Sequence, residues 1–153
     1  MLNPTQVLQR LKLRPAWKGK TEIDFRILVY AQIFNPPAGA APTANSAMMF
    51  PDGAAVLGIT ASAFVPTVAA TGQGSRNRQL FLIDFAFVNN DAIVVGGPIM
   101  ADALLGGGES DIFPAQEIVV GPSQQINCRV ANLTTGALTV HVAYHCLVPR
   151  SSL

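Results

Sequence analysis

The sequence predicts an all-β protein, a sandwich or barrel of about eight antiparallel strands. Short apolar segments alternate with period two, and turn signals recur roughly every ten residues along the chain. The 13 glycines and 11 prolines leave little room for long helices. At 153 residues, the chain is long enough for one domain with a sizeable core and too short for two. We therefore expect a single β domain.

Charge is scarce and unevenly distributed. Only 12% of the residues are charged, against roughly 25% in an ordinary soluble domain. The first twenty residues carry five bases and no acid, whereas the remainder carries five bases and nine acids. Between Ile27 and Ser75 the only formal charge is Asp52. A folded stretch with one charge is expected to be buried in the domain or against another chain.

The chain divides into a basic N-terminal arm, residues 1–20, and a β-sandwich domain, residues 21–153. In the arm, Asn3 is placed to cap a helix and Pro4 suits its first position. The helix should be short, should end before Pro15, and has one apolar face, formed by Val7, Leu8 and Leu11. Packing on its own domain and packing on a neighbouring subunit are both open. We expect the arm to cross to a neighbour, because so short a helix is marginal alone.

In the first half of the domain, the clearest strand runs over residues 22–29. Its odd-numbered residues point one way and its charged residues the other; the first set is Ile23, Phe25, Ile27 and Val29. Residues 38–47 are rich in Ala and Pro without periodicity, which predicts a long loop. Weak strands are expected over 54–65, between two prolines.

In the second half, residues 79–88 are apolar on both faces apart from Asp84, which is typical of a central strand. A short strand is expected over 93–95, and a single helical turn or an edge strand over 100–105. The strand over 111–120 carries Pro114 and should either lie at an edge or contain a bulge. Residues 125–130 and 138–146 alternate and are expected to pair as a hairpin that turns at 134–136.

The sequence predicts no enzyme, no metal site and no cofactor. His141 and His145 lie on one strand face about 13 Å apart, too far to share a zinc ion. The inward-facing Cys128 and Cys146 are expected to be buried free thiols. Acids near the second glycine cluster lack the regular spacing of a calcium loop; they are Asp102, Glu109 and Asp111. Asp84 is expected to be a hydrogen-bonded structural carboxylate, and the sequon that begins at Asn132 to be a turn.

The arm is the one segment that implies a partner. Its bases interleave with an aromatic residue, and together they are the expected subunit-contact residues: Arg10, Lys12, Arg14, Trp17, Lys18 and Lys20. An acidic protein surface, a solvated arm and nucleic acid are the alternatives. Nucleic acid is not the expected partner, because the rest of the chain offers no basic face. Deleting residues 1–20 is expected to leave the sandwich folded and to weaken assembly, more so at high salt.

The closing region carries a resemblance to a known class of protein. Residues 118–126, Ile-Val-Val-Gly-Pro-Ser-Gln-Gln-Ile, and residues 132–140, Asn-Leu-Thr-Thr-Gly-Ala-Leu-Thr-Val, combine a strand, a Gly-Pro turn and further strands. With the composition, this resembles the small jelly-roll structural proteins of tailed-phage virions, over roughly residues 20–150 and at the level of pattern. The resemblance implies a jelly-roll sandwich of about eight antiparallel strands. The short N-terminal helical arm is predicted from its own residues and has no counterpart in this class.

The resemblance also implies a function. A capsid cement or decoration subunit would stabilise the shell through protein–protein contacts, as part of the virion after synthesis in the host cytoplasm. Its partners would be copies of itself, as a trimer or larger ring, and the major capsid or other virion proteins. A neck, tail or baseplate protein is one alternative. Another is a carbohydrate-binding module of a fibre or spike, with Trp17 and Tyr30 as stacking residues. No membrane is expected, because no apolar run reaches 18 residues.

Overall fold

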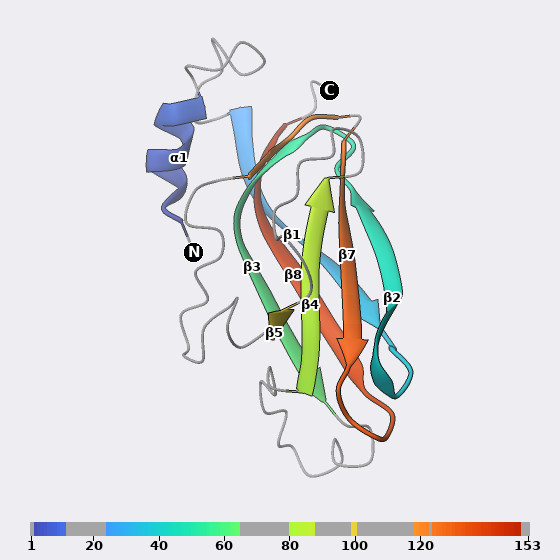
Figure 1. Ribbon diagram of the computed structural model, residues 1–153. Coiled ribbons are helices and arrows are strands. Elements are labelled where there is room, and N and C mark those ends of the chain that lie inside the picture. Colours follow the sequence, from blue (N-terminus) through green and yellow to red (C-terminus); the bar gives the residue numbers. More distant parts are fainter. Residues whose placement is uncertain are drawn as a thin grey trace.

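The computed structural model describes residues 2–11, 24–64, 80–87, 99–100, 118–122 and 124–150, which form two packed β-sheets and one helix (Figure 1). The elements, in chain order, are α1 (Pro4–Leu11), β1 (Phe25–Phe34), β2 (Gly39–Met49), β3 (Ala54–Phe64), β4 (Phe81–Phe87), β5 (Ile99–Met100), β6 (Ile118–Val120), β7 (Gln125–Asn132) and β8 (Thr139–Pro149). The expected antiparallel β-sandwich of eight strands is confirmed. The segments expected over 12–23, 93–95 and 101–117 lie outside the described residues.

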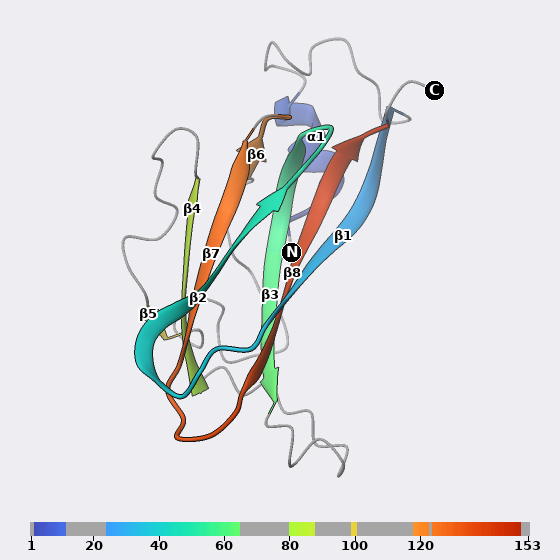
Figure 2. The ribbon, with the colours of Figure 1, turned by 90° about the vertical axis from the view of Figure 1, so that its right-hand side faces the viewer.

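Within the described residues, the two sheets each contain four strands. One sheet has the order β1-β8-β3-β6 and the other the order β2-β7-β4-β5. Figure 2 shows the sheets as two layers, and Figure 1 shows α1 at the left of the molecule, beside β3. As expected, β4 is an interior strand, and β6 lies at an edge.

The pairing is nested along the chain. The first strand pairs with the eighth, the second with the seventh, the third with the sixth and the fourth with the fifth, all antiparallel. The two halves of the chain therefore run side by side as one folded ribbon, and its successive pairs alternate between the sheets.

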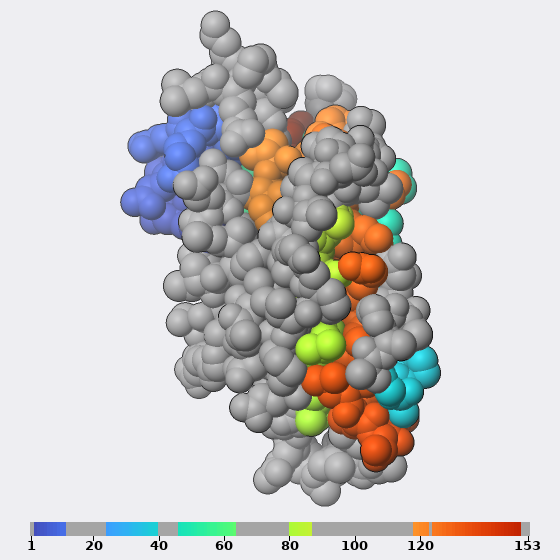
Figure 3. Space-filling view, in the orientation of Figure 1, coloured from blue at the N-terminus to red at the C-terminus, as the bar shows by residue number. Residues whose placement is uncertain are grey.

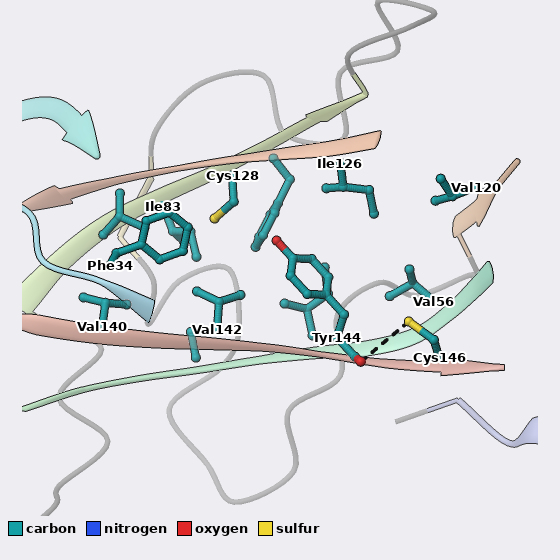
Figure 4. Packing of buried hydrophobic residues seen from close by; sticks show 14 of the residues in the cluster. Phe34, Val56, Ile83, Val120, Ile126, Cys128, Val140, Val142, Tyr144 and Cys146 are labelled. Atoms are coloured by element: carbon teal, nitrogen blue, oxygen red, sulfur yellow. Dashed lines mark hydrogen bonds between the residues drawn. The ribbon is translucent and has the colours of Figure 1, made fainter. Parts of the chain in front are cut away.

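The core fills the space between the sheets. Its largest fully buried side chains include Phe50, Phe81, Phe85 and Tyr144. The Tyr144 ring meets Phe50 and Phe85 edge-on, with centroids 6.1 and 6.2 Å apart. This is a favourable arrangement of aromatic pairs. Figure 4 shows Tyr144 reaching from β8 across the interior toward β7.

The expected C-terminal hairpin is wrong. Strand β7 pairs with β2 and β4, whereas β8 pairs with β1 and β3, so the two strands lie in different sheets. Both strands bury the residues that the alternation predicted. In β7 these are Ile126, Cys128 and Val130, and in β8 they include Val140, Val142 and Tyr144. Figure 4 shows Cys128 and Ile126 facing Val142 and Tyr144 across the core. Alternation indicates which side of a strand is buried and does not indicate which strand it pairs with.

The connection between β7 and β8 is organised by Asn132, whose side chain is fully buried. Its Nδ2 donates to the carbonyl oxygens of Pro36 and Gly136, at 3.2 and 2.8 Å. Its Oδ1 accepts hydrogen bonds from the backbone N and the hydroxyl of Thr134, at 2.8 and 2.7 Å. The sequon asparagine therefore has the turn role expected of it.

Residues 38–47 were expected to form a loop, and this is wrong. They belong largely to β2, which pairs with β7 from Gly39 to Met49, with a register irregularity between Gly39 and Ala44. Small residues and a proline have low strand propensity. Pairing with β7 overrides that local preference.

A tight turn leads from β2 into β3 and crosses from one sheet to the other. Gly53 has a φ of 72° and its N–H donates to the carbonyl oxygen of Phe50 at 3.0 Å. A Cβ at this position would lie 2.9 Å from the carbonyl oxygen of Val120. Glycine is therefore required both for the left-handed conformation and for the close approach of β6.

Candidate interaction surface

The outer face of the sheet β1-β8-β3-β6 is the candidate functional surface. Cross-strand neighbours on this face follow from the strand register. The four rows, read from β1 through β8 to β3, are Ile27–Leu147–Ala55, Val29–His145–Gly58, Ala31–Ala143–Thr60 and Ile33–His141–Ser62. No residue of these rows is Asp, Glu, Lys or Arg. These rows therefore contain no carboxylate, ammonium or guanidinium group.

Helix α1 covers one end of this face. Its buried residues Val7, Leu8 and Leu11 form a cluster with residues of β1, β3 and β8, namely Phe25, Ala55, Leu57 and Leu147. Figure 3 shows the helix as a ridge on one side of the molecule, on the side away from β2. The helix start is secured by Asn3, whose Oδ1 accepts from the backbone N of Thr5 at 2.9 Å and of Gln6 at 3.4 Å. The N-cap prediction is confirmed.

A β-bulge in β3 provides the attachment point for the helix. The register with β8 shifts between Val56 and Gly58, so Leu57 is the extra residue. Its side chain is fully buried in the cluster beneath the helix, and its carbonyl oxygen accepts a hydrogen bond from the N–H of Leu2 at 2.9 Å. A bulge leaves one residue outside the ladder, and here that residue's carbonyl holds the chain before α1.

For residues 4–11, the structure shows the packing on the chain's own domain that the sequence left open as an alternative. A contact of the arm with a neighbouring chain stays a prediction. The helix is part of the domain that carries it, because its three apolar residues are buried against its own sandwich. Arg10 lies on its exposed side, in the last turn. The other expected contact residues, Lys12, Arg14, Trp17, Lys18 and Lys20, lie outside the described residues, and their role stays a prediction.

Beyond the helix, the same sheet face is uncovered. Ile27, Val29 and Ile33 of β1 are 55%, 57% and 64% exposed. We call this surface the open face and define it by Ile27, Val29, Ala31, Ile33, Thr60, Ser62, His141, Ala143 and His145. Three large aliphatic side chains in line on one strand are an apolar patch that a protein surface seldom leaves without a partner.

The sequence pattern does not predict this surface, because the alternation over residues 22–29 indicates a strand with only one apolar side. Leu28, Tyr30 and Phe34 pack against the core, while Ile27, Val29 and Ile33 face outward. The signal was present, since residues 27–34 are apolar on both faces. A strand buried on only one side does not need that pattern.

The two histidines lie on the open face, as their alternation predicted. His145 Nε2 lies 3.3 Å from the hydroxyl oxygen of Thr60, and His141 is exposed. Within the described part of the chain, no group of three or more His, Cys, Asp or Glu residues could hold a metal ion. The histidines therefore contribute polar atoms to the open face, together with the hydroxyls of Thr60 and Ser62.

A shallow groove of about 200 Å³ continues the open face toward the helix. It lies between α1 and β1 and is lined by Pro4, Thr5, Leu8, Phe25, Arg26, Ile27 and Leu147. The lining is mostly apolar, with Arg26 at its side. The groove and the open face share Ile27, so a partner that covers one also reaches the other.

The thiols and the buried carboxylate are parts of the core structure. Cys128 and Cys146 are buried free cysteines, as predicted. Burial raises the pKa of the Cys146 thiol to about 12 and raises that of Cys128 further, which keeps both protonated and unreactive at neutral pH. Asp84, also buried, forms a bidentate ion pair with Arg129 of the neighbouring strand β7. It is the structural carboxylate that the sequence predicted.

Tyr30 does not fit the carbohydrate alternative. Its ring packs edge-on against Phe50 with centroids 5.1 Å apart, on the core side of β1. A sugar-stacking residue presents its ring face to solvent. Trp17, the other candidate, lies outside the described residues.

Comparison with family models, with curated proteins and with solved structures gives no match for this chain. Among the described residues, no helix is long and apolar enough to cross a membrane. The function is therefore argued from the open face and the fold.

Proposed function

We propose that this protein is a structural subunit that works by protein–protein contact, as a capsid cement or decoration protein of a virion. The observation that carries the proposal is the open face, which is aliphatic along β1 and contains no Asp, Glu, Lys or Arg. The cores of protein interfaces are depleted in charged residues in the same way. A surface of this kind suits a partner that also lacks charge.

The nested strand pairing supports the jelly-roll interpretation and hence the resemblance to virion proteins. Jelly rolls consist of eight strands in two sheets and occur in viral capsids, lectins and cupins. The pairing of β1 with β8, β2 with β7, β3 with β6 and β4 with β5 follows from folding such a chain in half. A fold shared by these classes does not by itself assign a function. The open face favours the structural class among them.

Charge distribution supports the same assignment. The open face draws its β1 and β3 residues from the stretch between Ile27 and Ser75, in which Asp52 is the only formal charge. The structure buries the inner side of these strands and leaves the outer side uncharged. Burial in the core accounts for the missing charge on the inner side of β1 and β3, and a partner on the open face would account for it on their outer side.

The test is co-sedimentation of the full chain with empty capsid shells of the virus that encodes it. We expect the chain to sediment with the shells and Ile33→Lys to reduce the bound fraction about tenfold, because a lysine would be desolvated in the contact. Leu133→Lys is the matched control, since Leu133 is also an exposed aliphatic residue, 38% exposed and outside the open face. Wild-type protein that stays in the supernatant, or equal effects of both substitutions, would contradict the proposal.

A further inference from the structure

The four edge strands of the two sheets differ in how well they are protected. In the described part of the chain, β5 has two residues and β6 has three. The third edge strand, β2, is long, but it contains Pro42 and a register irregularity between Gly39 and Ala44. Short length, proline and bulges are the devices by which proteins prevent an edge from pairing with another chain.

Strand β1 has none of these devices. It runs for ten residues and pairs with β8 in one unbroken register, from Phe25 opposite Pro149 to Phe34 opposite Val140. It contains no proline, and Arg26 near its start is its only formal charge. Within the described sheets its other edge has no strand neighbour. Between Ile27 and Ile33, every second residue of β1 directs its backbone N–H and C=O toward that edge, where no described strand pairs with them.

We propose that β1 pairs antiparallel with β1 of a second copy of this chain, about a two-fold axis, so that the two sheets join into one. This pairing rests on the proposed function, because a structural subunit of a shell must contact other subunits. Adding a strand to an exposed sheet edge is a general mode of recognition. A two-fold contact uses the same patch on both copies, which requires the strand to be complementary to itself.

The residues of β1 meet that requirement in one register. Side chains on one face pair only with those on the same face, so residue numbers of opposite partners sum to an even number. With a sum of 60, Ile27 lies opposite Ile33 of the second copy and Val29 opposite Ala31. The four exposed outer residues of the strand then pair only among themselves. A sum of 58 would place Ile33 opposite Phe25, which is already buried beneath the helix.

Charge and area agree with a second copy as the occupant. In this register Arg26 lies opposite Phe34 at the outer end of the ladder, so no like charges face each other. Residues 26–34 extend over about 30 Å. With a sandwich about 20 Å thick at its edge, the contact covers about 600 Å² on each copy, near the lower limit of stable interfaces. The contact joins pairs of subunits, and a trimer or ring would need a second, different contact.

The test measures the dimer dissociation constant of the full chain by sedimentation equilibrium. In the proposed register, positions 29 and 31 face each other twice. Val29→Lys with Ala31→Lys places like charges opposite one another and should weaken the dimer about tenfold or more. Val29→Lys with Ala31→Glu places opposite charges there and should restore the dimer to near the wild-type constant. Both positions are exposed, so the fold should tolerate both double variants.

The control is Leu133→Lys with Thr135→Lys, which adds the same charge at two exposed positions outside the open face. This control should dimerise like the wild type. A monomeric wild type, an unaffected double-lysine variant, or a charge swap no better than the double lysine would overturn the pairing. A monomer that still sediments with capsid shells would overturn the pairing alone and leave the proposed function. A β1-paired dimer that does not bind shells would support the pairing and contradict the cement role.

Discussion

The outer face of the sheet β1-β8-β3-β6 has two ends that differ in what covers them. At one end, helix α1 buries Phe25, Leu57 and Leu147. At the other, Val29 and Ile33 of the same strand β1 stay more than half exposed. Both ends are apolar, so sequence hydrophobicity alone does not separate them. The chain covers the first end itself, whereas the described residues leave the β1 side of the second end exposed.

The largest expected effect tests the two ends directly. Leu57→Ala removes a fully buried side chain at the covered end and should lower the free energy of unfolding by about 2–5 kcal/mol. Ile33→Ala at the uncovered end should lower it by less than about 1 kcal/mol. Urea denaturation at one protein concentration measures both. Equal losses would show that Ile33 is buried in solution, already covered by a partner copy.

A second prediction concerns the core that both ends share. The Cys146 thiol has an ordinary pKa of 9.0, and burial raises it to about 12. The folded state therefore keeps a proton that the unfolded state loses above pH 9. The stability due to this thiol is fully present below pH 9 and falls by about 1.4 kcal/mol per pH unit up to about pH 12.

Cys146→Val removes this titration and keeps an apolar side chain of similar size. Urea denaturation at pH 8 and pH 10.5 should show a smaller alkaline loss in the variant than in the wild type. Below pH 9 the two proteins should show the same pH dependence, which is the internal control. An equal loss in both above pH 9 would mean that the Cys146 thiol ionises in the folded state as it does in solvent.

The smallest expected effect concerns the cap of the covering helix. Asn3→Ala removes the acceptor for the N–H groups of Thr5 and Gln6 and should lower stability by about 1 kcal/mol. Thr5→Ala, in the same turn, is the control and should have a smaller effect. Thermal unfolding followed by circular dichroism measures both. If the two variants melt together, the cap does not hold the helix on the covered end.

The sequence predicted strands better than it predicted their partners. Alternation placed Ile126, Cys128 and Val130 in the core correctly, because a strand buried on one side has apolar residues at every second position. The wrong pairing of β7 with β8 has a physical reason. A short polar connection suits a hairpin within one sheet and an arch between two sheets equally well. Asn132 stabilises the arch by donating to the carbonyl oxygen of Pro36, distant in sequence, and to that of Gly136 within the connection.

The candidate surface was harder to predict than the fold. The sequence pattern predicts contact residues among the bases of the arm, where positive charge is concentrated. The structure leaves aliphatic residues of β1 exposed. From the sequence alone, such residues are expected in the core because they are apolar. Only the packing of α1 on its own sandwich shows which end of the face is covered. The four consecutive apolar residues 54–57, which interrupt the alternation of β3, were the local sign of the bulge.

The bulge at Leu57 also makes the attachment of α1 independent of the regular alternation of β3. Loss of one residue normally turns every later side chain of a strand to the wrong face. In β3 the inward residues are Ala54 and Val56 before the bulge, and Ile59 and Ala61 after it. Without Leu57, these same residues would alternate without interruption. The attachment point of α1 is thus a one-residue insertion into a strand that would be regular without it. A related chain without this residue could lack the helix and keep the same sandwich.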